Sequence, residues 1–108
     1  MKINLDEKGL NAVFKPWQLA IIEYLSNNRI PLTSRQIHET IQPEHPVSRA
    51  SVINFLNYLR DEGLIQYEVD SGRGGMHGVY KGSTTVRGVW SEIKARVLFW
   101  LSEGELVY

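Results

Sequence analysis

Residues 48–63, SRASVINFLNYLRDEG, combine a helical pattern of apolar side chains with a capping residue at each end. Ser48 can accept a hydrogen bond from an unpaired backbone N–H of the first turn, and Gly63 can adopt the left-handed conformation that ends a helix. Four apolar residues between them recur at i, i+3, i+4 and i+7, which is the spacing of one helix face. They are Val52, Phe55, Leu56 and Leu59. The segment therefore predicts an amphipathic helix whose apolar face lies in a core.

The opposite face of this helix carries short side chains instead of the Glu and Lys mixture of an ordinary solvated helix. Ala50, Asn54 and Asn57 lie on it, flanked by Ser51 and Tyr58. Short side chains allow close approach to a DNA groove, where asparagine amides can hydrogen-bond base edges and an alanine can contact a thymine methyl. We therefore interpret the helix as a candidate for insertion into DNA.

Two further helices are expected before it. A helix over residues 16–27 begins with a proline, which is tolerated in a first turn. Thr33 and Gln36 match a capping box, which predicts a short helix over residues 34–42. A brief connection then leads to the amphipathic helix, and the three together predict a helix-turn-helix. Residues 1–11 are expected to form a short strand or a loosely held arm.

The pattern changes from helix to strand after Gly63. Residues 64–69 alternate between apolar and polar side chains, and residues 79–81 can form a returning strand. The turn between them contains four glycines. Arg73 lies among those glycines and can reach a minor groove, where His77 can add a contact. A β-hairpin is therefore predicted directly after the third helix.

A last helix over residues 84–102 carries an apolar seam at coiled-coil spacing. The seam residues are Val86, Trp90, Ile93, Val97 and Trp100, and Val89 and Leu101 widen the same face. Because residues 97–101 are apolar nearly all round, we expect this end to be buried on more than one side. A second copy of the chain is the favoured cover, which predicts a homodimer through residues 84–108. Packing on its own domain, or against a membrane or a foreign partner, are the alternatives.

The composition fits one globular domain of 108 residues without cysteine, which excludes disulfides and thiolate metal sites. Twelve Lys and Arg balance twelve Asp and Glu, which speaks against nucleic-acid binding, although a local positive patch matters more than the total. No apolar run is long enough for a signal peptide or a membrane span. We therefore expect a cytoplasmic protein without membrane contact.

The residue patterns of enzymes are missing. His38 and Glu39 begin no HExxH motif, because Gln42 occupies the position of the second histidine. The glycine-rich turn follows a strand but opens no helix, so it does not fit a nucleotide-binding loop. We expect no catalytic residue, no cofactor and no metal, and a zinc site on His45 and His77 is the disfavoured alternative.

The candidate contacts to double-stranded DNA come from three elements. Arg49 and Tyr58 suit phosphates, and Arg35 lies at the start of the second helix, where backbone N–H groups also favour phosphate. The complete expected set is Ser34, Arg35, Ser48, Arg49, Ala50, Ser51, Asn54, Asn57, Tyr58, Arg73 and His77.

The order of these elements resembles winged helix-turn-helix domains of the penicillinase-repressor and MarR-like groups. The resemblance covers residues 16–82 and rests on LTSRQI at 32–37, on S-x-x-S-V-x-x-x-L-x-x-L-x-x-x-G-L-I at 48–65, and on Gly72 and Arg73. It implies a third helix in the major groove, a hairpin (the wing) on the backbone or minor groove, and dimerisation through a C-terminal helical segment. The chain departs from the pattern in having only Arg49 and Arg60 as basic residues of the third helix, and one C-terminal helix.

The expected fold is mainly α with a small β-hairpin, an α+β winged helix-turn-helix over residues 1–83 followed by a dimerisation helix over residues 84–108. The expected function is that of a homodimeric DNA-binding transcription regulator, specifically a repressor. The alternative is a winged-helix module for protein interaction, in which Phe99, Trp100 and the hairpin bind another protein.

Overall fold

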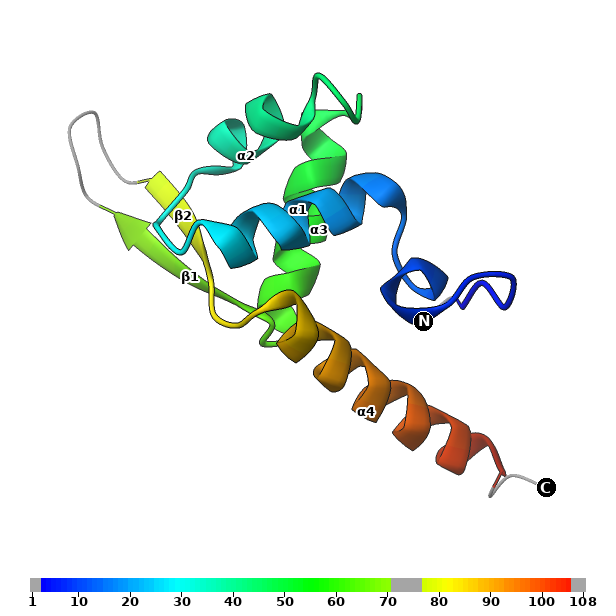
Figure 1. Cartoon of the computed structure of the whole chain (residues 1–108). Coiled ribbons are helices and arrows are strands. Elements are labelled where there is room, and N and C mark those ends of the chain that lie inside the picture. Colours follow the sequence, from blue (N-terminus) through cyan, green and yellow to red (C-terminus); the bar gives the residue numbers. More distant parts are fainter. Residues whose placement is uncertain (1–2, 71–76, 106–108) are drawn as a thin grey trace.

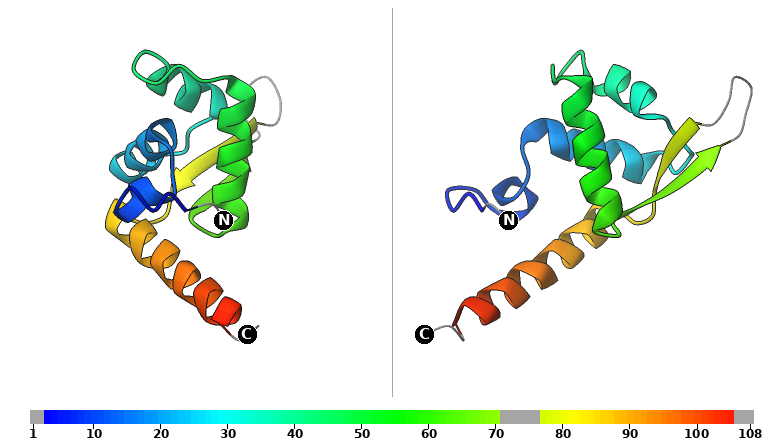
Figure 2. Two further views of the ribbon diagram at one scale, coloured as in Figure 1. Left: turned by 90° about the vertical axis from the view of Figure 1, so that its right-hand side faces the viewer. Right: turned by 180° about the vertical axis from the view of Figure 1, so that it is seen from behind.

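The computed structural model describes residues 3–70 and 77–105, in which three helices enclose a core, a hairpin lies at one side, and a long helix extends away (Figure 1). The described elements are a 3-10 turn η1 (Gly9–Ala12), the helices α1 (Pro16–Asn27), α2 (Ser34–Ile41) and α3 (Arg49–Asp61), the strands β1 (Ile65–Asp70) and β2 (His77–Gly82), and α4 (Val86–Glu105). The two further views of Figure 2 show α4 directed away from the other three helices.

Most predicted elements are present, with small shifts at their ends. The first helix has the predicted bounds, both strands reach further toward the turn than the alternation indicates, and α4 begins two residues later than predicted. Residues 3–8 form no strand and are mostly exposed, and η1 follows them, after which Phe14 is buried in the core. The backbone N–H of Phe14 donates to the carbonyl of Leu10 at 2.8 Å, and the Phe14 ring packs edge-on against Phe55.

The caps of α3 form as the sequence indicates. The Ser48 hydroxyl accepts a hydrogen bond from the backbone N–H of Ser51 at 3.1 Å. At the other end Gly63 has a φ of 74°, and the N–H of Leu64 donates to the carbonyl of Leu59 at 2.9 Å. These are the features of a Schellman motif, in which the two leucines also make the accompanying apolar contact. Both of them are buried, so the end of α3 is fixed by packing as well as by hydrogen bonds.

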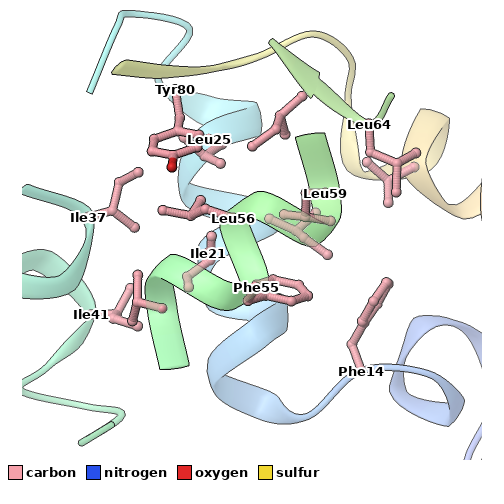
Figure 3. Close-up of a cluster of buried hydrophobic side chains, with 14 of the residues drawn as sticks. Phe14, Ile21, Leu25, Ile37, Ile41, Phe55, Leu56, Leu59, Leu64 and Tyr80 are labelled. Atoms are coloured by element: carbon pink, nitrogen blue, oxygen red, sulfur yellow. The ribbon is translucent and has the colours of Figure 1, made fainter. Parts of the chain in front are cut away.

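The core lies where α1, α2 and α3 meet beneath the hairpin (Figure 3). Its fully buried side chains come from all three helices and from α4: Ile21, Leu25, Ile37, Val52, Leu56, Leu59 and Ile93. Replacing one such leucine by alanine costs about 2–5 kcal/mol in a packed core. The apolar face of α3 is thus buried as predicted, and its orientation is set by three surrounding elements.

The hairpin is joined to the helical part by one additional backbone pairing. Strands β1 and β2 run antiparallel with Tyr67 opposite Tyr80. On the other side of β2, Leu32 forms an isolated bridge with Tyr80, with N–H to carbonyl distances of 2.9 and 2.7 Å. This bridge connects the segment between α1 and α2 to the hairpin. Three helices followed by a hairpin that pairs in this way form a winged helix-turn-helix of the α+β class, which confirms the predicted fold.

Helix α4 is covered by its own chain along the first half only. Val89 and Ile93 are buried, and Val86, Trp90 and Val97 pack against the same core beside α1 and η1. Val89 and Ile93, which the sequence pattern assigns to a dimer interface, therefore lie in the core of their own chain. The spacing of apolar residues cannot distinguish core packing from a dimer interface. A helix face that packs against η1 and α1 has the same spacing as one that packs against another copy.

The second half of α4 carries four exposed apolar side chains, namely Leu98, Phe99, Trp100 and Leu101. Arg96 precedes them and holds the helix to the end of α3, because its guanidinium pairs with the Glu62 carboxylate at 3.1 Å and donates to the Glu62 carbonyl. No helix among the described residues is both long and apolar enough to cross a bilayer.

Gly82 tests the contact between the hairpin and α1. A Cβ at this position would lie 2.2 Å from the carbonyl oxygen of Leu25, which is a backbone atom that cannot rotate away. We expect Gly82→Ala to destabilise the fold by at least about 2 kcal/mol through overpacking, measured as a lower urea midpoint. The exposed neighbour Lys81 supplies the control, and Lys81→Ala should leave the midpoint nearly unchanged. Equal midpoints for both variants would contradict the close approach.

Candidate nucleic-acid interface

Side-chain hydrogen bonds to the backbone fix the start of α2 and the turn between α2 and α3. Thr33 caps α2 by accepting from the N–H of Gln36, whose own amide oxygen accepts from the N–H of Thr33 at 2.8 Å. Further on, Nε2 of His38 lies 2.8 Å from the carbonyl of Val47, and the N–H of Val47 donates to the Gln42 side chain at 3.1 Å. These contacts set the angle between the two helices and give His38 a structural role.

The N-terminal turn of α3 is open to solvent on the side away from the core. Ser48, Arg49 and Ala50 are exposed there, and Asn54 is exposed one turn further along. The amide of Asn54 makes no hydrogen bond within the described part of the chain, so both its donor and its acceptor are available. The open face of α3 thus has the position that the sequence pattern predicts.

Asn57 is less available than the pattern suggests. Its amide oxygen accepts a hydrogen bond from the Tyr80 hydroxyl at 3.1 Å, and the residue is half-buried between α3 and the hairpin. Burial raises the pKa of Tyr80, with a further increase from Tyr67 and an opposing effect of Arg60, so the hydroxyl remains a donor. One acceptor site of the Asn57 amide is thus occupied, and the pair positions the hairpin against α3.

Tyr58 lies on the other side of α3, toward α1. Its ring stacks on Phe55 with the centroids 6.2 Å apart, and the side chain is half-buried. Burial raises the pKa of the Tyr58 phenol, the Glu62 carboxylate raises it further, and Arg96 opposes both. The Tyr58 ring therefore packs against the domain, and only its hydroxyl could make the predicted phosphate contact.

A cleft of about 440 Å³ lies beside this face, between α1 and α3. Aromatic side chains line it on the α1 side and Ser51, Asn54 and Tyr58 on the α3 side. The cleft cannot be read from the sequence, because the two lining segments are separated by more than thirty residues in the chain. An excess of aromatic residues at 14–17 was the available signal, and core packing explains that excess equally well.

Two arginines near this face, the predicted contact Arg35 and the neighbouring Arg60, are paired with carboxylates. Arg35 on α2 forms an i,i+4 ion pair with Glu39 at 2.9 Å, and both side chains are largely exposed. Arg60 pairs with Asp61 at 3.1 Å while its guanidinium lies over the Tyr67 ring at 5.1 Å. Within the described residues Arg49 forms no ion pair, so it is the cation of α3 that is free to contact a phosphate.

Three other predicted contacts have different outcomes. Ser34 is half-buried in the first turn of α2, next to the exposed Arg35. Arg73 lies outside the described residues. The backbone of His77 begins β2 opposite Asp70, and its side chain lies outside the described part. In the described residues, no group of three His, Asp or Glu is placed to hold a metal ion.

Two solved structures share this arrangement of helix-turn-helix and hairpin. One comes from a study of the DNA recognition and protein interaction domains of HOP2, with a TM-score of 0.52, 24% identity, and coverage of 62% of this chain and 98% of that chain. The other is a PadR family transcriptional regulator from Eggerthella lenta DSM 2243, with a TM-score of 0.55, 19% identity, and coverage of 82% and 80%.

The fold is a winged helix. At these identities the likeness concerns the fold alone, and no family model and no curated protein sequence matches the chain. The winged-helix part of the predicted resemblance is supported by the PadR family structure, whereas the likeness to the penicillinase-repressor and MarR-like groups has no counterpart among these matches.

The raised pKa of Tyr58 predicts a stability change at alkaline pH. The folded chain holds the phenolic proton more tightly than the unfolded chain, whose pKa is near the ordinary value of 10.0. The contribution of the protonated Tyr58 phenol to the free energy of unfolding is therefore fully present below pH 10. It is lost as the pH rises through the higher pKa of the folded state. Urea unfolding of the wild type and Tyr58→Phe checks this. The difference between their stabilities should be constant at neutral pH and should shift in favour of the variant above about pH 10.

Proposed function

We propose that the protein is a DNA-binding transcription regulator that acts as a homodimer, with α3 in the major groove. The observation that carries the proposal is the division of α3 into two faces. One face is fully buried against α1 and α2, while the N-terminal turn on the other side is open and carries short polar side chains. A helix that is held rigidly on one side and free on the other can enter a groove without rearrangement of the fold.

The contacts follow from this orientation. Arg49 and the hydroxyl of Ser48 lie at the start of α3, where phosphates of the groove edge would pass, and Ala50 is small enough to allow close approach. The Asn54 amide can pair with adenine through its free donor and acceptor. Ser34 and Arg35 would contact the neighbouring phosphates, and we assign Arg73 and His77 of the hairpin to the backbone or the minor groove.

The paired cations limit how strongly one copy can bind. Ion pairs with Glu39 and Asp61 reduce the positive charge that Arg35 and Arg60 bring to the phosphates. Because phosphate contacts supply most of the non-specific affinity, one copy with a single unpaired cation on α3 should bind weakly. Two linked copies would gain affinity through their combined contacts, which makes dimerisation part of the proposed mechanism.

The second half of α4 supports a homodimer. Trp100 and Leu101 continue the face that Val89 and Ile93 use against the core, but this part of the helix lies beyond the domain and is exposed. The same part of a second copy offers an identical apolar seam, so two helices can cover one another with aromatic anchors in the centre. A repressor is the simplest form of such a regulator, since a dimer on its site blocks access without a further partner.

The second candidate is a winged-helix module that binds another protein. The exposed Leu98 and Phe99 of α4 favour it, and the matched HOP2 structure comes from work on protein interaction as well as DNA recognition. The two functions make different demands on the open face of α3. DNA binding uses Arg49 and Asn54, whereas a protein-interaction module that uses only α4 needs neither.

Arg49→Ala tests the DNA-binding proposal. On duplexes selected from random DNA, we expect weaker binding to all sequences and a logarithmic salt slope reduced by about 1, since one phosphate contact is lost. Asn54→Ala should instead relax the preference at one base pair. Arg87 on α4 is exposed and basic but lies away from α3, so Arg87→Ala is the control and should keep the wild-type slope. Absence of any salt-dependent complex for the wild type contradicts the proposal.

Trp100→Glu tests the homodimer. Light scattering should give twice the mass of one chain for the wild type at micromolar concentration and a single-chain mass for the variant, because a carboxylate in the seam is too costly to bury. Ala95 is exposed on the opposite side of α4, so Ala95→Glu adds the same charge as a control and should remain dimeric. A monomeric wild type removes the homodimer from the proposed function.

A further inference from the structure

The two asparagines on the open face of α3 have different surroundings. Asn54 and Asn57 are three residues apart, which separates them by about 4.5 Å along the helix axis, and both share the face of Ala50. Asn54 is exposed, and its amide makes no hydrogen bond within the described part of the chain. Asn57 is half-buried, and its amide oxygen accepts from the Tyr80 hydroxyl at 3.1 Å. Two identical side chains therefore offer different groups to a ligand.

Tyr80 is held in place by its backbone and by its ring. Its N–H and its carbonyl pair with Leu32 at 2.7 and 2.9 Å, which fixes the residue between the hairpin and the segment before α2. Its ring is buried and extends from β2 into the core (Figure 3). The ring of Tyr67 lies 5.0 Å away between centroids, and the guanidinium of Arg60 lies over Tyr67. The Tyr80 hydroxyl is consequently a fixed group beside α3.

This hydroxyl determines which way the Asn57 amide is turned. Within the described residues, the Asn57 oxygen is the acceptor of the Tyr80 proton. If the amide were reversed, its NH₂ group would face the hydroxyl oxygen, and the hydroxyl proton of a buried tyrosine would lose its acceptor at a cost in free energy. The oxygen of Asn57 is therefore shared with Tyr80, while its NH₂ group makes no hydrogen bond to any described residue.

We propose that Tyr80 is a positioning residue that turns Asn57 into a hydrogen-bond donor for guanine, whereas Asn54 pairs with adenine. In the major groove guanine presents two acceptors, N7 and O6, but adenine presents the N7 acceptor beside the N6 donor. Pairing with adenine uses both the oxygen and the NH₂ group of an asparagine, and the oxygen of Asn57 is already engaged. Guanine needs the NH₂ group alone. The base preference rests on the proposed DNA-binding function, whereas the orientation of the Asn57 amide does not.

The orientation is tested on the full chain without DNA. Tyr80→Phe keeps the buried ring and removes the hydroxyl, so in ¹H–¹⁵N spectra the side-chain NH₂ signal of Asn57 should shift while that of Asn54 stays in place. Tyr67→Phe is the matched control, because it removes a neighbouring hydroxyl that makes no bond to Asn57 within the described residues. It should leave both signals unmoved. An Asn57 signal that stays in place in Tyr80→Phe, or that moves equally in both variants, overturns the role of Tyr80.

The base preference is measured on a duplex selected from random DNA. The base pair that Asn57 contacts is the position at which Asn57→Ala loses discrimination. There the wild type should bind guanine about tenfold more tightly than adenine. Tyr80→Phe should lower or reverse this ratio, because the released amide can turn its oxygen toward the adenine N6, and Tyr67→Phe should keep the wild-type ratio. A wild type that does not prefer guanine, or a Tyr80→Phe variant that weakens binding to all sequences alike, overturns the proposal.

Asn57→Asp is a second variant that keeps the contact to the hairpin. Its carboxylate can still accept from the Tyr80 hydroxyl, but the donor NH₂ group is gone, so the preference for guanine should disappear. An unchanged preference in this variant would show that another residue contacts the base. Failure of the wild type to bind DNA refutes the proposed function and the base preference together, and the spectral test of the amide is unaffected.

Discussion

The burial of one face of α3 is the interaction on which the rest of the structure depends. Val52, Leu56 and Leu59 have no exposed surface, and they belong to one core cluster with buried residues of α1, α2, the hairpin and α4. Because protein cores are packed to the density of organic crystals, α3 cannot rotate about its axis without opening voids on several sides at once. The open face is consequently held in a fixed orientation, and no described residue buries its N-terminal turn.

Local sequence signals were sufficient for the helical framework. The capping box at Thr33 and Gln36, the Ser48 cap and the Gly63 ending are each determined within a few residues, so their chemistry can be recognised without knowledge of the fold. The hairpin was recognisable for the same reason, since a change from helical to alternating spacing is a local property. The apolar residues Leu10, Val13 and Phe14 extend the pattern of the first helix upstream and indicate a preceding turn, and η1 lies at that place.

The candidate site was predicted less completely because its details depend on distant contacts. The hydrogen bond between Tyr80 and Asn57 joins residues 23 positions apart, and the sequence near Asn57 does not predict it. The same applies to α4, where one uninterrupted seam proved to have a covered half and an uncovered half. Periodicity shows which side chains share a face, but the length of the domain beside the helix decides where the cover stops.

The contacts of Arg96 have a mechanical consequence. A helix of 20 residues is about 30 Å long, and this one is fastened to the end of α3 through the carboxylate and the carbonyl of Glu62. These contacts, together with the burial of Val89 and Ile93, hold the first half of α4 against the domain. If two chains join at the exposed ends of α4, as proposed, these contacts constrain the separation of their α3 helices. A dimer of this kind would favour one spacing between two half-sites on a duplex over other spacings.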